Sequence, residues 1–369
     1  MMRSAEPRDP FRDLLRPELA ALKAYVPVPT RSDVIRLDAN ESPHPLPPEA
    51  RELLGRALAE VPLHRYPAVR ATRLRELVAE RESVHPDQIV FGCGSDEVIA
   101  LTLNALARPR AGREKAAVLF PDPTFVMFRM SALALGLEPV GVALDDRWDL
   151  EVDSMRDALE RTRPNVVFLP SPNNPTGNLF SPARLDAVIA HARESLVVLD
   201  EAYGPFARVH YRDAMRSNAH VGRLQTLSKL GLAAARVGWA ILPVELAREV
   251  DKVRQPYNFN ALSQRAAELC LTSLAPFFDA TVTAILHERE RLARGLGAIT
   301  GVTVSPSASN FLWVELPVDA GEVHARLLAR GVLVRSFHAA GPRLARRVRI
   351  TVGASVENDA LLSALAACL

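Results

Sequence analysis

The sequence has few cysteines: Cys93, Cys270 and Cys368 stand far apart in a chain of 369 residues. They form no C-x-x-C pair and no other spacing typical of metal ligands, so we expect no metal site. A small, odd number of cysteines suits a reducing compartment, where disulfides are rare. These absences predict a cytoplasmic protein without a disulfide framework.

Long apolar runs and an excess of one charge are also missing. The N-terminus, "MMRSAEPRDPFRDLL", contains no apolar core of a signal peptide, and charges such as Glu138 and Arg236 interrupt the apolar stretches. None of these stretches reaches the roughly 18–20 residues that a membrane span needs. The 45 lysines and arginines nearly balance 43 acidic residues, whereas a nucleic-acid binder usually shows a basic stripe. We therefore expect no membrane and no nucleic-acid partner.

Short apolar runs alternate with amphipathic patterns between residues 88 and 243. The runs are "QIVFGCG", "AAVLFPDP", "PVGVAL", "NVVFLPSP", "SLVVLDEAY", "GRLQTLS" and "VGWAILP". One of the helices between them is expected to begin at Ser181-Pro182, with the serine as N-cap and the proline at the first helical position. Strands that are apolar throughout and are joined by amphipathic helices predict a mainly parallel sheet covered on both faces.

The pattern changes after about residue 265. Long helical patterns lead to the runs "NFLWVEL", "VLVRSF" and "RRVRITVG" and then to a closing helix. With 48% hydrophobic residues the chain can bury a large core divided between two domains. We predict an α/β fold with an N-terminal arm (1–32), a large domain built on a mainly parallel sheet flanked by helices (33–265) and a smaller C-terminal α+β domain (266–369).

Unusual polar residues follow several of the apolar runs. In open parallel sheets ligands bind at the carboxyl ends of the strands, which is where these residues are expected. "GCGSDEVIALTL" is a glycine turn that opens a helix, and the free N–H groups of such a turn can bind an anion. The same stretch, taken alone, is equally typical of an ordinary helix with Ser95 as its N-cap.

Three further stretches complete this set. "SPNNPTGN" contains Asn174 in a turn, and "VVLDEAY" ends an apolar strand on Asp200, with Tyr203 three residues later. A plain turn and a helix N-cap are alternative interpretations of these two. "TLSKLGLAAAR" contains Lys229 and Arg236 in an otherwise apolar segment, and a desolvated lysine is a nucleophilic amine suited to Schiff-base chemistry.

One ligand would explain all four stretches. It needs a phosphate for the glycine turn and Arg236, a carbonyl for Lys229, a basic ring nitrogen for Asp200 and a phenolate oxygen. Pyridoxal 5′-phosphate carries all of these groups. The sequence therefore predicts pyridoxal 5′-phosphate as the cofactor, with Thr226 and Ser228 also on the phosphate.

The order of the motifs points to a family. The motifs are "LDANESPHPLP", "HRYP", "GCGSDE", "PDPTFVMF", "SPNNPTGN", "LDEAY", "TLSK", "QPYNFNALSQ", "ASNFLWV", "VLVRSF" and "RITVG". With them the chain resembles the fold-type I pyridoxal-phosphate aminotransferases, and most of all the histidinol-phosphate aminotransferases. The resemblance extends from about residue 22 to about residue 359.

The resemblance implies a role for each matching residue. Lys229 binds the cofactor covalently, Asp200 pairs with its ring nitrogen, Asn174 and Tyr203 bond its ring oxygen, and Phe125 stacks on the ring. The phosphate is held by Gly94, Ser95, Asp96, Glu97, Thr226, Ser228 and Arg236. Tyr66 reaches the phosphate from a neighbouring subunit, which implies a homodimer with shared active sites. The substrate is bound by Tyr25, Asn40, Glu41, Asn174, Arg335 and Arg349.

Two positions depart from the family pattern. Phe125 stands where tyrosine is usual, so stacking is kept and a hydroxyl is lost. Cys93 replaces a polar side chain between the two glycines, and a small buried apolar residue is the simpler interpretation of it. The interval of seven residues between Lys229 and Arg236 is the shorter of two common spacings.

The resemblance implies transamination in L-histidine biosynthesis. Histidinol phosphate and imidazole-acetol phosphate would exchange an amino group with 2-oxoglutarate and glutamate. Each substrate ends in an anion, so Arg335 and Arg349 alone distinguish them poorly, and selection is expected at the imidazole end. An aromatic or broad-range aminotransferase and a phospho-amino-acid decarboxylase on the same scaffold remain alternatives. A ligand-sensor domain of a transcription regulator is disfavoured, since it would need a helix-turn-helix domain before residue 30.

Overall fold

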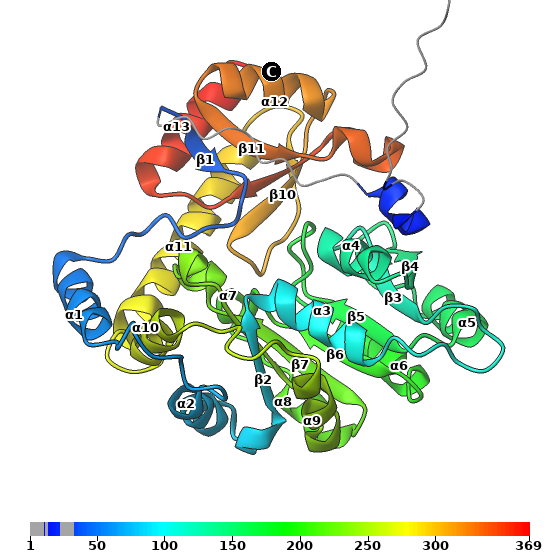
Figure 1. Ribbon diagram of the computed structural model, residues 1–369. Coiled ribbons are helices and arrows are strands. Elements are labelled where there is room, and N and C mark those ends of the chain that lie inside the picture. The colour runs from blue at the N-terminus through cyan, green and yellow to red at the C-terminus, as the bar shows by residue number, and fades with distance from the viewer. Residues whose placement is uncertain (1–10, 12–13, 23–32) are drawn as a thin grey trace, which may run out of the picture.

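The larger of two sheets lies in the lower half of Figure 1. The computed structural model describes residues 11, 14–22 and 33–369. Within them the larger sheet has seven strands in the order β2-β8-β7-β6-β5-β3-β4. Their bounds are Ile89–Cys93 (β2), Ala117–Asp122 (β3), Glu138–Ala143 (β4), Val166–Pro170 (β5), Leu196–Asp200 (β6), Val221–Thr226 (β7) and Val237–Ile241 (β8). Only β8 pairs antiparallel with its neighbours, which confirms the predicted mainly parallel sheet.

Helices cover both faces of this sheet, and the apolar strands follow from that. In β5, Phe168 packs in the core with α3, α4 and α9, whereas Val167 and Leu169 pack in the core with α5 and α6. A strand buried on both faces has no polar side, so its sequence does not alternate. The helices are α3 (Ser95–Ala105), α4 (Val126–Ala134), α5 (Val152–Thr162), α6 (Pro182–His191) and α9 (Val244–Lys252).

A third core lies beside β2 and β8. It combines Phe91 and Trp239 of these strands with Leu74 and Val78 of α2 and with Ala267 of α10. The helices here are α1 (Pro48–Ala59), α2 (Thr72–Glu82) and α10 (Ala261–Leu271). Short helices connect other elements: α7 (Gly204–Ala207), α8 (Arg212–Ser217), η2 (Pro17–Ala21), η3 (Pro86–Gln88), η4 (Ser228–Leu230), η5 (Ala233–Ala235), η6 (His338–Ala340) and η7 (Pro342–Leu344).

The second sheet lies at the top of Figure 1 and has the order β1-β11-β12-β10-β9. Its strands are β1 (Ile35–Leu37), β9 (Thr303–Val304), β10 (Phe311–Glu315), β11 (Val332–Ser336) and β12 (Arg347–Thr351). The helices α11 (Ala275–Gly297), α12 (Ala320–Ala329) and α13 (Ser355–Ala366) pack on it. The α+β character of this part agrees with the sequence pattern.

The structure differs from two details of the sequence analysis. No strand was expected at residues 35–37, yet they form β1, which pairs with β11 and belongs to the second sheet; the domain boundaries themselves remain a prediction. Ser181 and Pro182 do begin α6, but the Ser181 hydroxyl donates to Asp149 instead of capping the helix. Among the described residues no single helix could cross a membrane; α10 and α11 pass the length and composition test only as a pair bent by 74°.

Candidate active site

A cavity of about 280 Å³ lies at the carboxyl ends of β5, β6 and β7, where the second sheet faces the first. It brings together most of the residues that the sequence suggested. These are Asn40, Ser95, Asp96, Phe125, Asn174, Asp200, Tyr203, Thr226, Ser228, Lys229, Arg236, Arg335 and Arg349. The two arginines come from β11 and β12, so both sheets contribute side chains to one site.

Asp200 is the last residue of β6 and is buried at the bottom of the site. Burial raises the pKa of its carboxyl to about 7, and the negative charges of Asp96 and Glu201 act in the same direction. The backbone N–H of Ala202 donates a 2.9 Å hydrogen bond to Oδ1 and partly offsets this. A buried carboxyl with a raised pKa becomes a stable anion beside a cation, such as a protonated ring nitrogen.

Lys229 lies in the short helix η4, directly after β7. Its Nζ is 3.4 Å from the carbonyl oxygen of Ala39 and 6.0 Å from the centre of the Tyr203 ring. Gly231 follows with φ +118°, a conformation that glycine adopts easily and that ends the short helix. This places the amine inside the cavity, next to the end of the strand that carries Asp200.

Ser95, Thr226, Ser228 and Arg236 form what we call the anion site. The Oγ1 of Thr226 lies 2.9 Å from the Oγ of Ser228, and Arg236 Nη2 lies 3.1 Å from the carboxylate of Asp96. Ser95 is the first residue of α3, where free N–H groups and the helix dipole favour an anion. Two hydroxyls, a guanidinium and a helix N-terminus together suit a phosphate group.

Gly94 explains how Arg236 reaches this site. Gly94 has φ +82°, and a Cβ placed on it would lie 2.5 Å from Arg236 Nη2. A side chain there would fill the space that the guanidinium occupies. Gly94, and not Ser95, is therefore the N-cap residue of α3, which corrects the helix-cap interpretation of Ser95. The residues at this end of the cavity fit the phosphate of the predicted cofactor.

Asn40 and Arg349 connect the second sheet to the predicted ring contacts. Nδ2 of Asn40 donates a 2.8 Å hydrogen bond to the hydroxyl of Tyr203. Nη1 of Arg349 donates to Oδ1 of Asn174 at 2.6 Å, and its Nη2 donates to the carbonyl of Asp38. The residues predicted to hold the substrate and the ring oxygen are thus bonded directly to one another.

Several predicted residues are not among the described residues that line the cavity. The carboxylate of Glu97 accepts hydrogen bonds from the backbone N–H of Cys93 and from Asn258, so it supports the glycine turn; a carboxylate would also repel a phosphate. Glu41 lines a separate hollow beside the second sheet. Tyr66 is 79% exposed and stacks on Tyr257 with the ring centres 4.4 Å apart. Tyr25 lies outside the described residues.

Other residues line the cavity that the sequence analysis did not single out. They are Asp38, Ala39, Thr124, Val126, Pro170, Pro172, Pro175, Ala202 and Phe337. Thr124 donates a 2.8 Å hydrogen bond to Asn173 and so supports the loop of Asn174. Phe337 stands two residues after Arg335 in the motif "VLVRSF", which was the available signal for it.

Comparison with known proteins agrees with this geometry. The sequence model of the aminotransferase class I and II family matches residues 32–367. The chain belongs to the aminotransferase class I and II family. A relative from this family, histidinol-phosphate aminotransferase 1 of Burkholderia lata, is 42% identical over 96% of this chain and 97% of the relative.

Solved structures of an aminotransferase and of a decarboxylase share the fold. Histidinol-phosphate aminotransferase from Sinorhizobium meliloti, solved in complex with pyridoxal-5′-phosphate, has a TM-score of 0.83 at 24% identity and covers 99% of this chain and 98% of its own. L-threonine-O-3-phosphate decarboxylase from Porphyromonas gingivalis has a TM-score of 0.74 at 19% identity and covers 90% and 98%. The fold alone therefore does not separate transamination from decarboxylation.

Proposed function

We propose that this aminotransferase uses pyridoxal 5′-phosphate to transfer an amino group from glutamate to imidazole-acetol phosphate, which yields histidinol phosphate and 2-oxoglutarate. One observation carries the proposal: a lysine, a buried carboxyl and an anion site meet in one cavity of a chain that is 42% identical to a histidinol-phosphate aminotransferase. The reaction is reversible and is a step of L-histidine biosynthesis.

The residues of the cavity fit the cofactor. The anion site would hold its phosphate, Lys229 its aldehyde, Asp200 its ring nitrogen, and Asn174 with Tyr203 its ring oxygen. Phe125, at the start of α4, lines the same cavity and would cover the ring. When bound, the group supplies an electron sink for the pair that is released when the substrate Cα–H bond breaks.

The chain itself supplies proton transfer and orientation. The amine of Lys229 would remove the proton from Cα of glutamate and, in the second half of the reaction, deliver a proton to the acceptor carbon that receives the amino group, which is general base and general acid catalysis. The carboxylate of Asp200 would keep the ring nitrogen of the cofactor protonated. Arg335 and Arg349 bind the anionic end of the substrate by charge-assisted hydrogen bonds. Both substrates would use this one cavity and would react in turn.

The active unit in this proposal is a homodimer in the cytoplasm. Tyr66 and Tyr257 form an exposed, stacked aromatic pair, and a second subunit would bury it. From there Tyr66 would contact the phosphate in the partner's cavity. The three cysteines are free thiols, which agrees with a reducing compartment.

Steady-state assays of the purified, cofactor-loaded protein test the function. We expect imidazole-acetol phosphate with glutamate to react with a far higher kcat/KM than phenylpyruvate with glutamate, and Lys229→Ala to remove both activities. Equal values for the two acceptors would indicate a broad-range or aromatic aminotransferase. Carbon dioxide release from a phospho-amino acid without any keto acid would indicate the decarboxylase.

A further inference from the structure

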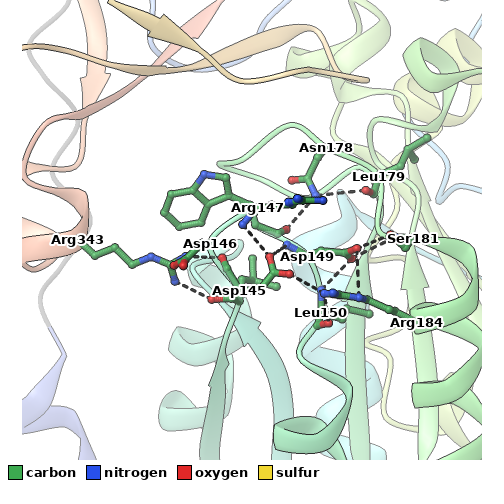
Figure 2. A network of polar contacts seen from close by, with 12 residues as sticks. Asp145, Asp146, Arg147, Asp149, Leu150, Asn178, Leu179, Ser181, Arg184 and Arg343 are labelled. Atoms are coloured by element: carbon green, nitrogen blue, oxygen red, sulfur yellow. Dashed lines mark hydrogen bonds and ion pairs between the residues drawn. The ribbon is translucent and has the colours of Figure 1, made fainter.

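Arg343, in the connection between β11 and β12, contacts the loop that follows β4 of the first sheet (Figure 2). Its Nη1 donates a 2.7 Å hydrogen bond to the carbonyl of Leu144, and its Nη2 donates to the carbonyl of Asp145. The guanidinium carbon lies 4.1 Å from the centre of the Trp148 ring, within the range of a cation–π contact. The edge of the guanidinium thus donates hydrogen bonds to one loop, residues 144–150, and its face packs on the Trp148 ring of the same loop.

This loop is fixed by its own hydrogen bonds, as Figure 2 shows. Oδ1 of Asp145 accepts hydrogen bonds from the backbone N–H groups of Arg147 and Asp149, each at 2.8 Å. Oδ2 of Asp145 pairs with Arg184 of α6 at 2.6 Å. Asp149 in turn accepts from the backbone N–H of Ser181, at the start of α6. Arg343 therefore binds a loop that is tied by these bonds to α6.

Hydrogen bonds connect the backbone of Trp148 to one wall of the cavity. Its carbonyl oxygen accepts a 2.9 Å hydrogen bond from Nδ2 of Asn178. The carbonyl of Asn178 accepts a 2.9 Å hydrogen bond from the N–H of Asn173, the neighbour of Asn174. The loop that lines the cavity with Asn174 is therefore joined to the loop that Arg343 contacts.

Contacts between aromatic rings connect the Trp148 side chain to the opposite wall of the cavity. It meets Trp313 of β10 edge-on with ring centres 5.9 Å apart, and Trp313 meets Phe337 in the same way at 5.0 Å. Trp313 is fully buried, whereas Phe337 lines the cavity two residues after Arg335. Both walls of the cavity, one from each sheet, thus have a contact path to Trp148.

We propose that Arg343 is a positioning residue for substrate binding, which holds the second sheet in the arrangement that brings Arg335 and Arg349 to the cavity. Both arginines lie on the strands that Arg343 connects, and Arg343 is closer to the Trp148 ring, at 4.1 Å, than Arg347 of β12, at 5.3 Å. Without this contact a smaller fraction of the enzyme is competent to bind, and apparent affinity falls by that fraction. The chemical step, carried by Lys229, is unchanged in the enzyme that has bound substrate.

The test compares Arg343→Ala with a matched control in the holoenzyme. Arg346→Ala removes an arginine three residues away whose partner, Glu315, belongs to the same sheet. We expect Arg343→Ala to raise KM for histidinol phosphate by about five- to twentyfold with kcat changed by less than about twofold, and Arg346→Ala to leave both near wild type. Arg343→Lys keeps the charge and loses the planar contact, so its KM should lie between.

Tryptophan emission gives a second readout. Trp148 and Trp313 are two of the three tryptophans, and both belong to this contact path, while Trp239 lies in the third core. Trp148 is only 6% exposed, so Arg343→Ala should shift the emission to longer wavelength, and saturating histidinol phosphate should reverse the shift. An Arg343→Ala enzyme with the KM and emission of Arg346→Ala would overturn the proposal. So would a KM that rises together with a large loss of kcat.

The inference rests on the proposed function for its substrate, and the two can fail separately. A wild-type enzyme that does not use histidinol phosphate would refute the proposed function. The comparison would then be made with glutamate as the ligand, with the same expected changes in KM and emission. If Arg343→Ala does not fold, Arg343→Lys decides alone: a wild-type KM and emission in that variant would overturn the proposal.

Discussion

Arg349 of β12 donates a 2.6 Å hydrogen bond to the side-chain oxygen of Asn174, which follows β5 in the other sheet. The same guanidinium donates to the carbonyl of Asp38 and lies 5.5 Å from the centre of the Phe311 ring. The arginine is therefore held in place by both sheets. A substrate anion that binds here meets an oriented donor, and less conformational freedom is lost on binding than with a mobile side chain.

The first prediction concerns this orientation. Arg349→Lys keeps the positive charge and loses the fork of donors that contacts Asn174 and the Asp38 carbonyl. We expect KM for both glutamate and histidinol phosphate to rise by about 10- to 100-fold, since a charge-assisted hydrogen bond contributes about 1.5–3 kcal/mol. Steady-state kinetics beside an Arg346→Lys control measure this. Unchanged KM values would show that the anion is bound elsewhere.

The sequence was sufficient to place Asp200 and Lys229 at the carboxyl end of the larger sheet, because Asp200 ends the apolar strand β6 and Lys229 lies three residues after the end of β7. The strand fixes where such a residue lies, but the side-chain direction depends on neighbours that are distant in sequence. Glu97 illustrates this: its position in the motif suggested the phosphate, but its carboxylate is bonded to Cys93 and Asn258. The pairing of β1 with β11 was likewise hidden, since three residues carry too little pattern to identify a strand's partner.

Contacts between the two sheets could not be predicted from the sequence for the same reason. Trp148 stands in a turn with φ +64° after β4, and nothing in "DDRWDL" indicates that Arg343 covers its ring. Such a contact becomes visible only when the order of the strands and the packing of the sheets are known. The motifs predicted which residues line the cavity, whereas the structure was needed to show the contacts between those residues.

The second prediction follows from the raised pKa of Asp200. Its pKa is about 7 in the folded chain against a usual 3.8, so between these values the native state holds a proton that the unfolded state has released. Stability of the cofactor-free protein therefore falls as pH rises through this window, and the full loss is present above pH 7. Asp200→Asn removes the buried charge, so we expect its cofactor-free Tm at pH 8 to exceed that of wild type by about 2–6 °C.

The pH series and the cofactor provide the controls for Asp200→Asn. The difference in Tm should shrink as pH falls toward 3.8, because Asp200 then becomes protonated in the unfolded state as well. With cofactor bound, the wild type should have the higher Tm, because the ring nitrogen would pair with the carboxylate. The variant should lose most of its activity. Calorimetry at several pH values measures this. A variant that is less stable at every pH would contradict the raised pKa.

The third prediction concerns a buried ion-pair network behind Asp200. Arg223 of β7 is fully buried; its Nη2 lies 2.6 Å from Glu201 and its Nη1 lies 2.8 Å from Glu82. Removing the arginine leaves the buried Glu201 without its ion-pair partner and Glu82 with Arg212 alone, and breaking a buried ion pair typically costs about 3–5 kcal/mol. We expect Arg223→Met to lower the free energy of unfolding by that amount.

A neighbouring arginine is the control for Arg223→Met. Arg212 contacts Glu82 at 3.1 Å, but its side chain is 27% exposed, so water can replace it. Arg212→Met should therefore lower the free energy of unfolding much less than Arg223→Met does. Urea titrations of both variants measure this. Equal effects of the two substitutions would show that the network is not governed by burial.

The last prediction decides whether Tyr66 acts across subunits. Lys229→Ala and Tyr66→Ala are each expected to form poorly active homodimers. Half of the dimers in an equal mixture that has exchanged subunits are hybrids, and a hybrid has one site in which both residues are intact. Activity should therefore rise to about a quarter of wild type. The control mixes Lys229→Ala with Asp200→Asn, two changes within one chain's cavity, and should show no recovery. No recovery with Tyr66→Ala either would place Tyr66 in its own subunit's site or outside any site, because a hybrid would then contain no repaired cavity.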